Sequence, residues 1–195
     1  MTKPPSRPRK PKAAKSIDLP EIDLTRVANP DIKNFLSDSG NSESLAKGYF
    51  LLGVEAEGRA DWEGAIEFYK AVLAVRPADP VSRYFAPHNL AYSMIQLRRL
   101  KEAEVYARAA IAANEEWPHA YNLLGIACRA MGNYQEAAGA FLTATLKGPK
   151  GKTAWLQLQS MLAEHPELHS VPDLTDAVES ARKFLESRGQ LPRGH

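Results

Sequence analysis

The feature that most constrains this chain is a recurrence of small residues at nearly constant spacing. The step from Ala91 to Gly125 is 34 residues, and the step from Ala103 to Ala137 is also 34. The step from Ala65 to Ala103 is 38. A period of this length indicates units that stack on one another, because no single unit of that size can bury its apolar face alone. The sequence therefore predicts an array of repeats.

Three segments carry the same order of apolar, small and aromatic residues. They are Tyr49, Leu52, Gly53, Ala65, Tyr69, Val72 and Pro77; then Pro87, Leu90, Ala91, Ala103, Ala107 and Ala110; and then Tyr121, Leu124, Gly125, Ala137, Phe141, Ala144 and Pro149. This order resembles the tetratricopeptide repeat, whose 34-residue unit reads W-x2-L-G-x2-Y, then A-x3-F, then P. The resemblance covers residues 46–151 and predicts units at about 46–79, 80–117 and 118–151.

The resemblance implies an all-α fold: a right-handed α-solenoid of antiparallel helix pairs, the tetratricopeptide-repeat superhelix, with capping helices. Small residues are expected where paired helices approach, since a bulkier side chain there would cost about 1–3 kcal/mol. These small residues are Gly53, Ala91 and Gly125 on the first helices and Ala65, Ala103 and Ala137 on the second helices. Gly58 and Gly132 are predicted to stop first helices, because glycine accepts the left-handed conformation common there.

Four extra residues precede the second unit. Asp79 is predicted to cap a helix whose first residue is Pro80, because a proline at this position gives up no hydrogen bond. Such a helix starts one turn early, runs to about Arg98 and contains Pro87. The alternative is a longer loop, followed by a helix of normal length from Tyr84.

The repeats belong to a predicted solenoid over residues 42–165. An amphipathic helix at 152–164 is expected to cap the stack. The carboxyl-terminal segment 166–195 contains a last helix, predicted over 173–188, that should fold back on the cap.

An amino-terminal arm is predicted over residues 17–41, with a short helix that begins after Asn29 and ends near Leu36. Apolar and acidic side chains alternate over 17–24. Three arrangements are open for this stretch: it packs along the first unit, it lies in the chain's own groove, or it is a loosely attached linker.

Residues 1–16 form a basic, proline-rich tail. The chain has 25 Lys and Arg against 23 Asp and Glu, a net charge of +2, but residues 1–15 hold six basic residues and no acid, which leaves −4 on the rest. Such a segment cannot bury enough apolar surface to fold, so disorder is predicted. It is either a solubilising tail or a contact for nucleic acid or another anionic surface. The lack of interleaved aromatic residues argues against nucleic acid.

The sequence predicts no catalytic residues, no metal site and no cofactor. Cys128 is the one cysteine, so the chain cannot form an internal disulfide or a thiolate zinc cluster, and its helix face predicts a buried core residue. His165 and His169 are four residues apart, but Pro166 intervenes and no carboxylate or cysteine set completes a metal site. A glycine-rich phosphate loop and a serine elbow are both missing. A non-enzymatic protein is therefore predicted.

Membrane insertion is not expected either. The apolar runs are much shorter than a membrane span, and no apolar stretch follows the basic start as in a signal peptide. A reducing, cytoplasmic location is predicted.

The resemblance further implies that the first helix of each unit lines a concave groove. The predicted groove residues are Phe50, Val54, Phe85, His88, Asn89, Tyr92, Ile95, His119, Asn122, Ile126 and Arg129. Lys47 and Glu57 take further inward positions. This surface is more apolar than solubility requires, which predicts an adaptor that binds a peptide or helix of another protein. Alternatively, several of these side chains touch neighbouring helices or the chain's own arm.

Other functions stay open at this point. One is a small chaperone, similar to the three-repeat chaperones of bacterial type III secretion, that shelters an extended client segment. Another is self-association through the groove or the capping face. His88 and His119 both face the predicted groove, so peptide binding could depend on pH between about 5 and 8.

One known subclass of the family can be tested against this sequence. Repeats that hold the acidic C-terminus of Hsp70 or Hsp90 use five inward Lys, Asn or Arg residues. The matching positions here are Phe50, Val54, Asn89, His119 and Leu123. Only Asn89 conforms, so a clamp for a terminal carboxylate is not predicted.

Overall fold

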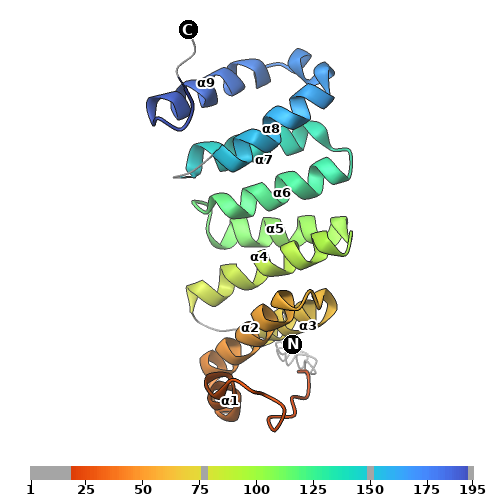
Figure 1. Cartoon of the computed structure of the whole chain (residues 1–195), viewed down its shortest axis with the longest axis vertical. Helices are drawn as coiled ribbons and strands as arrows, with labels where there is room; N and C mark the ends of the chain where they lie inside the picture. Colours follow the sequence, from red (N-terminus) through yellow and green to blue (C-terminus); the bar gives the residue numbers. More distant parts are fainter. Residues whose placement is uncertain (1–18, 76–78, 149–151, 193–195) are drawn as a thin grey trace, which may run out of the picture.

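The computed structural model describes residues 19–75, 79–148 and 152–192, and within them the chain is helical, with no β-strand. The helices are α1 (Pro30–Ser37), α2 (Ser42–Gly58), α3 (Trp62–Ala74), α4 (Pro80–Gln96), α5 (Leu100–Ala113), α6 (Pro118–Ala130), α7 (Tyr134–Lys147), α8 (Lys152–Glu164), the short 3-10 helix η1 (Pro166–Ser170) and α9 (Leu174–Ser187). They follow one another along the long axis of an elongated stack (Figure 1).

The stack is built from sequential antiparallel pairs. α2 packs on α3, α4 on α5 and α6 on α7, and each pair packs on the next. The first helices also touch one another directly, α2 with α4 and α4 with α6. These observations confirm the all-α solenoid of helix pairs.

The second unit begins one helical turn early, as the extended-helix prediction requires. α4 starts at Pro80 and contains Pro87. The Asp79 carboxylate accepts a hydrogen bond from the Ser82 backbone N–H at 3.3 Å, the geometry of a helix cap. The repeat prolines Pro77 and Pro149, which are expected to end the second helices of their units, lie outside the described residues; α3 ends at Ala74 and α7 at Lys147.

In the first and third units, the small residue of the first helix lies under an aromatic ring of the second helix. A Cβ atom added to Gly53 would sit 2.5 Å from Cε1 of Tyr69, and one added to Gly125 would sit 2.6 Å from Cε1 of Phe141. In the second unit an alanine, Ala91, takes the place of the glycine, and the ring position is itself an alanine, Ala107. The predicted close approach is therefore confirmed, and in two units it is an approach of a ring to backbone.

The turn between paired helices has the same form in all three units. α2 ends at Gly58 as predicted, but the left-handed residue of that turn is not Gly58. The left-handed residue is Ala60 (φ 57°), Arg98 (φ 59°) and Gly132 (φ 83°) in turn. Each turn is closed by backbone hydrogen bonds of the same register, such as Asp61 N–H to Ala56 C=O at 2.9 Å. This hydrogen-bond register fixes which residue of each turn is left-handed. Where that residue is not glycine, it must adopt a strained backbone conformation.

The amino-terminal arm packs on the first unit from residue 19 onward. Its partly buried apolar side chains are Leu19, Ile22, Leu24 and Val27. They pack against a core that includes Ile32 of α1 and Val72 of α3. The Tyr49 hydroxyl donates a hydrogen bond to the Pro20 carbonyl at 3.3 Å. Of the three arrangements for the arm, packing along the first unit is the one observed, while residues 17 and 18 and the tail 1–16 lie outside the described residues.

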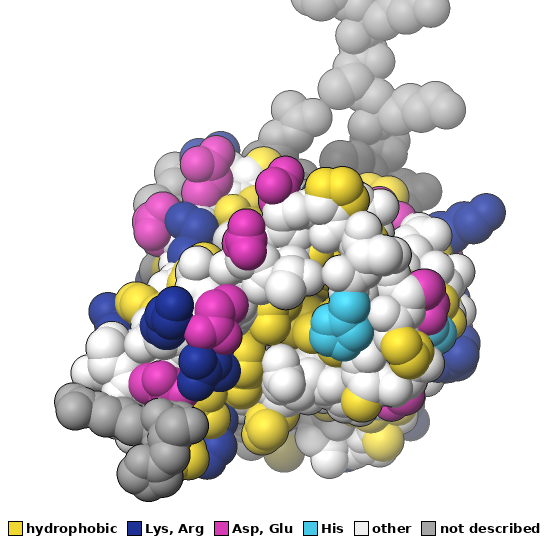
Figure 2. All heavy atoms as spheres, turned by 90° about the horizontal axis from the view of Figure 1, so that it is seen from above, with side chains coloured by type: hydrophobic (Ala, Val, Ile, Leu, Met, Phe, Trp, Pro, Cys, Tyr) yellow, Lys and Arg dark blue, Asp and Glu magenta, His cyan; other side chains and the backbone are white. Residues whose placement is uncertain are grey.

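The carboxyl-terminal end is closed by α8, η1 and α9. The buried face of α9 carries Leu174, Ala181 and Leu185, which join the core of α7 and α8. The closest packing of α9 is with α7 and η1, whereas folding back on α8 was predicted. The outer face of α9 is charged: Arg182 pairs with Glu179 and Glu186. Basic and acidic side chains alternate at one side of this end (Figure 2).

Among the helices in the described ranges, none combines the length and the apolar character that crossing a membrane requires.

Candidate functional site

The predicted groove residues lie on three first helices that touch one another. Phe50 and Val54 are on α2, the five residues from Phe85 to Ile95 are on α4, and the four from His119 to Arg129 are on α6. Val54 and Tyr92 are the exposed apolar members, with 43% and 38% of their surface accessible to solvent. The other apolar members are half-buried, because they also pack against neighbouring helices: Phe50, Phe85, Ile95 and Ile126.

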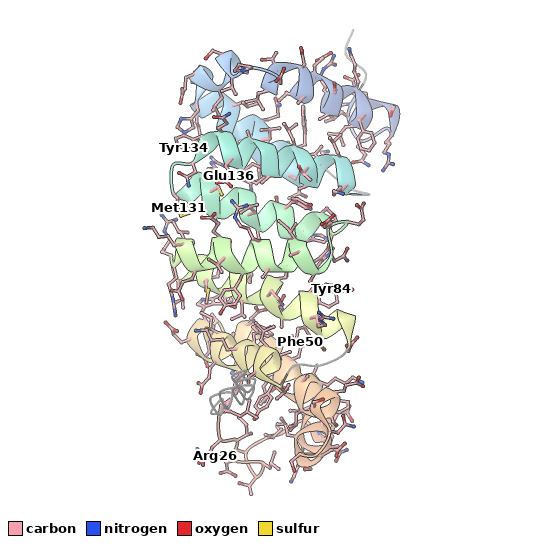
Figure 3. The ribbon with its side chains drawn as sticks, turned by 180° about the vertical axis from the view of Figure 1, so that it is seen from behind. Arg26, Phe50, Tyr84, Met131, Tyr134 and Glu136 are labelled. Atoms are coloured by element: carbon pink, nitrogen blue, oxygen red, sulfur yellow. The ribbon has the colours of Figure 1, made fainter. Side chains whose placement is uncertain are left out.

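An aromatic cluster forms one edge of this surface. Its centre is Trp117, which precedes α6; its ring centroid lies 5.0 Å from that of Phe85, 5.2 Å from that of Tyr84 and 4.4 Å from that of His88. Phe50 extends the cluster to α2, at 6.4 Å from Phe85. Figure 3 shows Phe50 facing α4 and Tyr84 near the amino-terminal end of that helix. Tyr84 and Trp117 were not among the predicted site residues, since neither falls on a groove position.

His88 is the titratable centre of the cluster. Its Nδ1 lies 2.9 Å from Oδ1 of Asn89, which accepts the hydrogen bond. Burial lowers the pKa of His88, the Asn89 hydrogen bond opposes this, and His119 lowers it further. The two histidine rings are 6.5 Å apart, so the structure brings together the pair that the sequence singled out.

A polar network crosses the floor of the surface from α2 to α4. The Ser93 hydroxyl donates to Oε1 of Glu57 at 3.1 Å, and Nδ2 of Asn89 donates to the Tyr69 hydroxyl at 3.0 Å. Ser93 is fully buried. Burial raises the pKa of Glu57, while hydrogen bonds from Ser93 and Tyr69 lower it. Ser93 and Tyr69 were not predicted to belong to the site, because their side chains point inward from positions that the repeat pattern assigns to the core.

Arg129 is engaged within the chain. One guanidinium nitrogen donates to both carboxylate oxygens of Glu164 at 2.8 Å, and the other donates to Gln157 at 3.1 Å. These partners lie on α8, so the surface continues onto the capping helix. A shallow cavity of about 380 Å³ lies between them, lined also by Ile126 and Tyr134. The hydrogen bond and ion pair to Arg129 lower the pKa of Glu164.

Two further residues differ in what they offer. Asn122 has a buried side-chain oxygen that accepts no hydrogen bond from the described residues. Cys128 is fully buried, and burial together with the nearby Glu136 charge raises the pKa of its thiol to about 12, as suits a core residue and not a nucleophile. No group of three or more potential metal ligands is found in the described part of the chain.

Comparison with known proteins places the chain in a structural class. Residues 120–153 match the family model of the tetratricopeptide repeat. Among solved structures, the crystal structure of MamA has a TM-score of 0.62 at 22% identity, over 82% of this chain and 88% of that one. No significant match is found among curated proteins.

Two shorter domains are also similar. The tetratricopeptide domain of Arabidopsis OM64 has a TM-score of 0.57 at 22% identity, over 62% of this chain and 97% of that one. The first such domain of Spaghetti (RPAP3), solved with the HSP90 peptide SRMEEVD, has the same TM-score and identity, over 63% and 94%. Domains of this fold are protein–protein interaction modules and usually have no catalytic role. The repeat pattern, the stacked helix pairs and these likenesses together make the chain a tetratricopeptide-repeat protein.

Proposed function

We propose that this chain is a non-catalytic adaptor that binds a peptide or helix of another protein across the surface of α2, α4 and α6. The observation that carries the proposal is a pair of exposed apolar side chains, Val54 on α2 and Tyr92 on α4. These two helices contact each other. Exposed apolar side chains gathered on one face of a domain usually mark an interaction site.

The surroundings of Tyr92 favour a binding role. Its ring and the Trp62 ring form a T-shaped pair, with centroids 5.8 Å apart, so Tyr92 is supported on one side while the side chain stays exposed. A rigid aromatic residue loses little conformational entropy on binding and supplies a large contact area. Ile95, one turn further along α4, and Ile126 on α6 offer further partly exposed apolar area.

The partner differs in chemistry from the acidic HSP90 tail that is bound in the Spaghetti domain. Four of the five positions matching the carboxylate clamp carry no Lys, Asn or Arg. The charge on Arg129 is already balanced by Glu164. An apolar contact, with few fixed charges, is therefore what this surface supplies.

The test is affinity capture from cell extract with the full chain and with a Tyr92→Glu, Ile126→Glu variant. Proteins bound by the intact chain should be lost with this variant, because a glutamate on each helix would have to be desolvated on binding. The matched control is Val105→Glu, which places the same charge at a 63% exposed valine on α5, outside the surface.

Both variants should keep the helical circular dichroism and cooperative unfolding of the parent chain, since all three positions are exposed or half-buried. Capture that survives in the double variant would refute the groove proposal. Capture that is lost only when residues 1–15 are deleted would move the function to the basic tail.

A further inference from the structure

The inward-facing charged residues on α2, α4 and α6 differ in how they are compensated. Arg129 is paired with Glu164. Lys47 lies with its ammonium 6.0 Å from the centre of the Phe35 ring, on α1 at the amino-terminal end of the stack. Glu57 has no cationic partner among the residues that the structure describes. One inward position thus carries a negative charge without a counter-ion.

Glu57 is held by neutral donors. Its carboxylate accepts hydrogen bonds from the hydroxyl groups of Ser93 and Tyr69, and the side chain is half-buried between α2 and α4. Partial burial disfavours the charged form and raises the pKa of this carboxyl group. A cation that arrived at Glu57 would remove part of that penalty, so the position favours a basic group over an acidic or neutral one.

Apolar surface adjoins this carboxylate. Val54 is one helical turn before Glu57 on α2, so the two share a face. Tyr92 lies on α4 next in sequence to Ser93, the donor to Glu57, and its ring packs on Trp62, the first residue of α3 after α2. Val54 and Tyr92 are also the two exposed apolar residues of the surface. Lysine and arginine have apolar stems that pack along such surface, and their charged ends interact favourably with an aromatic ring.

We propose that Glu57, Val54 and Tyr92 form a subsite for a lysine or arginine of the partner segment, flanked by an apolar residue. This inference rests on the proposed binding function and specifies the chemistry of its ligand. The cationic end pairs with Glu57, and the stem with its apolar neighbour covers Val54 and Tyr92. An acidic segment is disfavoured at the same position by repulsion from Glu57.

The chain's own tail fits this subsite less well than a separate partner does. Residues 1–16 contain six basic residues, but apart from prolines and Met1 their apolar side chains are only Ala13 and Ala14. Such a segment supplies the positive charge but lacks a larger apolar side chain next to it that could pack on Val54 and Tyr92. The partner is therefore a segment of another protein with a basic residue next to an aliphatic or aromatic one.

A phage-displayed library of random peptides, selected on the full chain, tests the subsite. The variant is Glu57→Gln, which keeps an oxygen to accept the Ser93 hydrogen bond and removes the charge. The matched control is Glu55→Gln on the same helix, where the glutamate is exposed and only 4.0 Å from Arg59. The parent chain and the control should enrich a basic residue beside an apolar one, and Glu57→Gln should enrich the apolar residue alone.

Other outcomes separate the subsite from the proposed function. Equal enrichment of basic residues by the parent chain and Glu57→Gln would overturn the subsite and leave groove binding intact, if the peptides fail to bind the Tyr92→Glu, Ile126→Glu variant. Peptides that still bind that double variant, or a failure to enrich any sequence on the parent chain, would overturn both.

A double-mutant cycle with one enriched peptide completes the test. Replacing its basic residue with norleucine should weaken binding to the parent chain at least about tenfold, and should have much less effect on Glu57→Gln. Equal losses on both proteins would refute a contact between the two groups. Deleting residues 1–15 should leave the affinity unchanged; a tenfold gain would show that the tail itself is the occupant and overturn the assignment to a separate partner.

Discussion

The ring of Tyr69 lies against the backbone of Gly53, so close that a Cβ on Gly53 would meet three of its carbon atoms at under 3.0 Å. Phe141 and Gly125 repeat this contact in the third unit. Tyr69 is fully buried, and its hydroxyl accepts the hydrogen bond from Asn89. The same ring therefore closes the first unit and supports the polar network under the proposed groove.

Gly53→Ala is expected to lower the free energy of unfolding by about 1–3 kcal/mol, because the buried ring must shift to admit a methyl group. Urea unfolding followed by circular dichroism measures this. Gly139→Ala is the control: Gly139 lies inside α7 with open space around it and should gain roughly 0.5–1 kcal/mol from helix propensity. Equal effects at the two glycines would contradict the contact.

The left-handed residues of the turns predict a gain in stability. Ala60→Gly and Arg98→Gly should each raise the free energy of unfolding by roughly 0.5–1 kcal/mol, because both parent residues are held at positive φ. Gly132→Ala should lower it by about 1 kcal/mol. Thermal unfolding of the three single variants decides the matter, and a loss of stability in both glycine variants would show that these turns are not strained.

The stability of the fold should depend on pH through His88. Its folded pKa lies below the unfolded value of about 6.5, so the unfolded chain binds the proton more readily. Neutral His88 therefore contributes its full stabilisation to the fold at pH values above the unfolded pKa. This contribution is lost as the pH falls from the unfolded pKa through the folded pKa. Urea unfolding between about pH 5 and 8 should show a steeper loss for the parent chain than for His88→Gln. The exposed His169, mutated to Gln, is the control and should behave like the parent.

Cys128 should be inert to thiol reagents in the folded chain. A rise of the thiol pKa from 9.0 to about 12 lowers the thiolate fraction at pH 8 by about a thousandfold, and burial blocks access as well. Ellman's reagent should react only as fast as the third unit opens, with the rate rising steeply in urea. A thiol that reacts at the rate of a free cysteine without urea would disprove this.

The parts of the fold that the sequence predicts well are those set by local chemistry and by the repeat. Asp79 and Pro80 mark the start of α4 because a cap and a first-turn proline act within a few residues. The residues of α8 follow from its apolar period. The left-handed conformation of Ala60 and Arg98 was not predicted, since neither residue type favours it. The available signal was that both residues align with Gly132 in the repeat.

The contacts of the candidate site depend on pairs that lie far apart in the sequence. Arg129 and Glu164 are 35 residues apart, about one repeat, yet the sequence offers several acidic residues at similar distances, and only the packing of α8 on the stack selects one. Trp117 lies two residues after Glu115, which takes the place of the repeat proline, and the repeat pattern assigns no role to this position. Its contacts with Tyr84 and His88 arise from the meeting of two units.

The charged outer face of α9 closes the carboxyl-terminal end of the stack to a further repeat. A further repeat could stack on the carboxyl-terminal end only against apolar side chains, and α9 covers those with its own Leu174 and Leu185 while it turns Glu179 and Arg182 outward. Tandem duplication of a unit would therefore have to occur ahead of α8, inside the array, where each new helix pair finds an apolar neighbour on both sides. Lengthening the binding surface and keeping its end intact are in this way compatible.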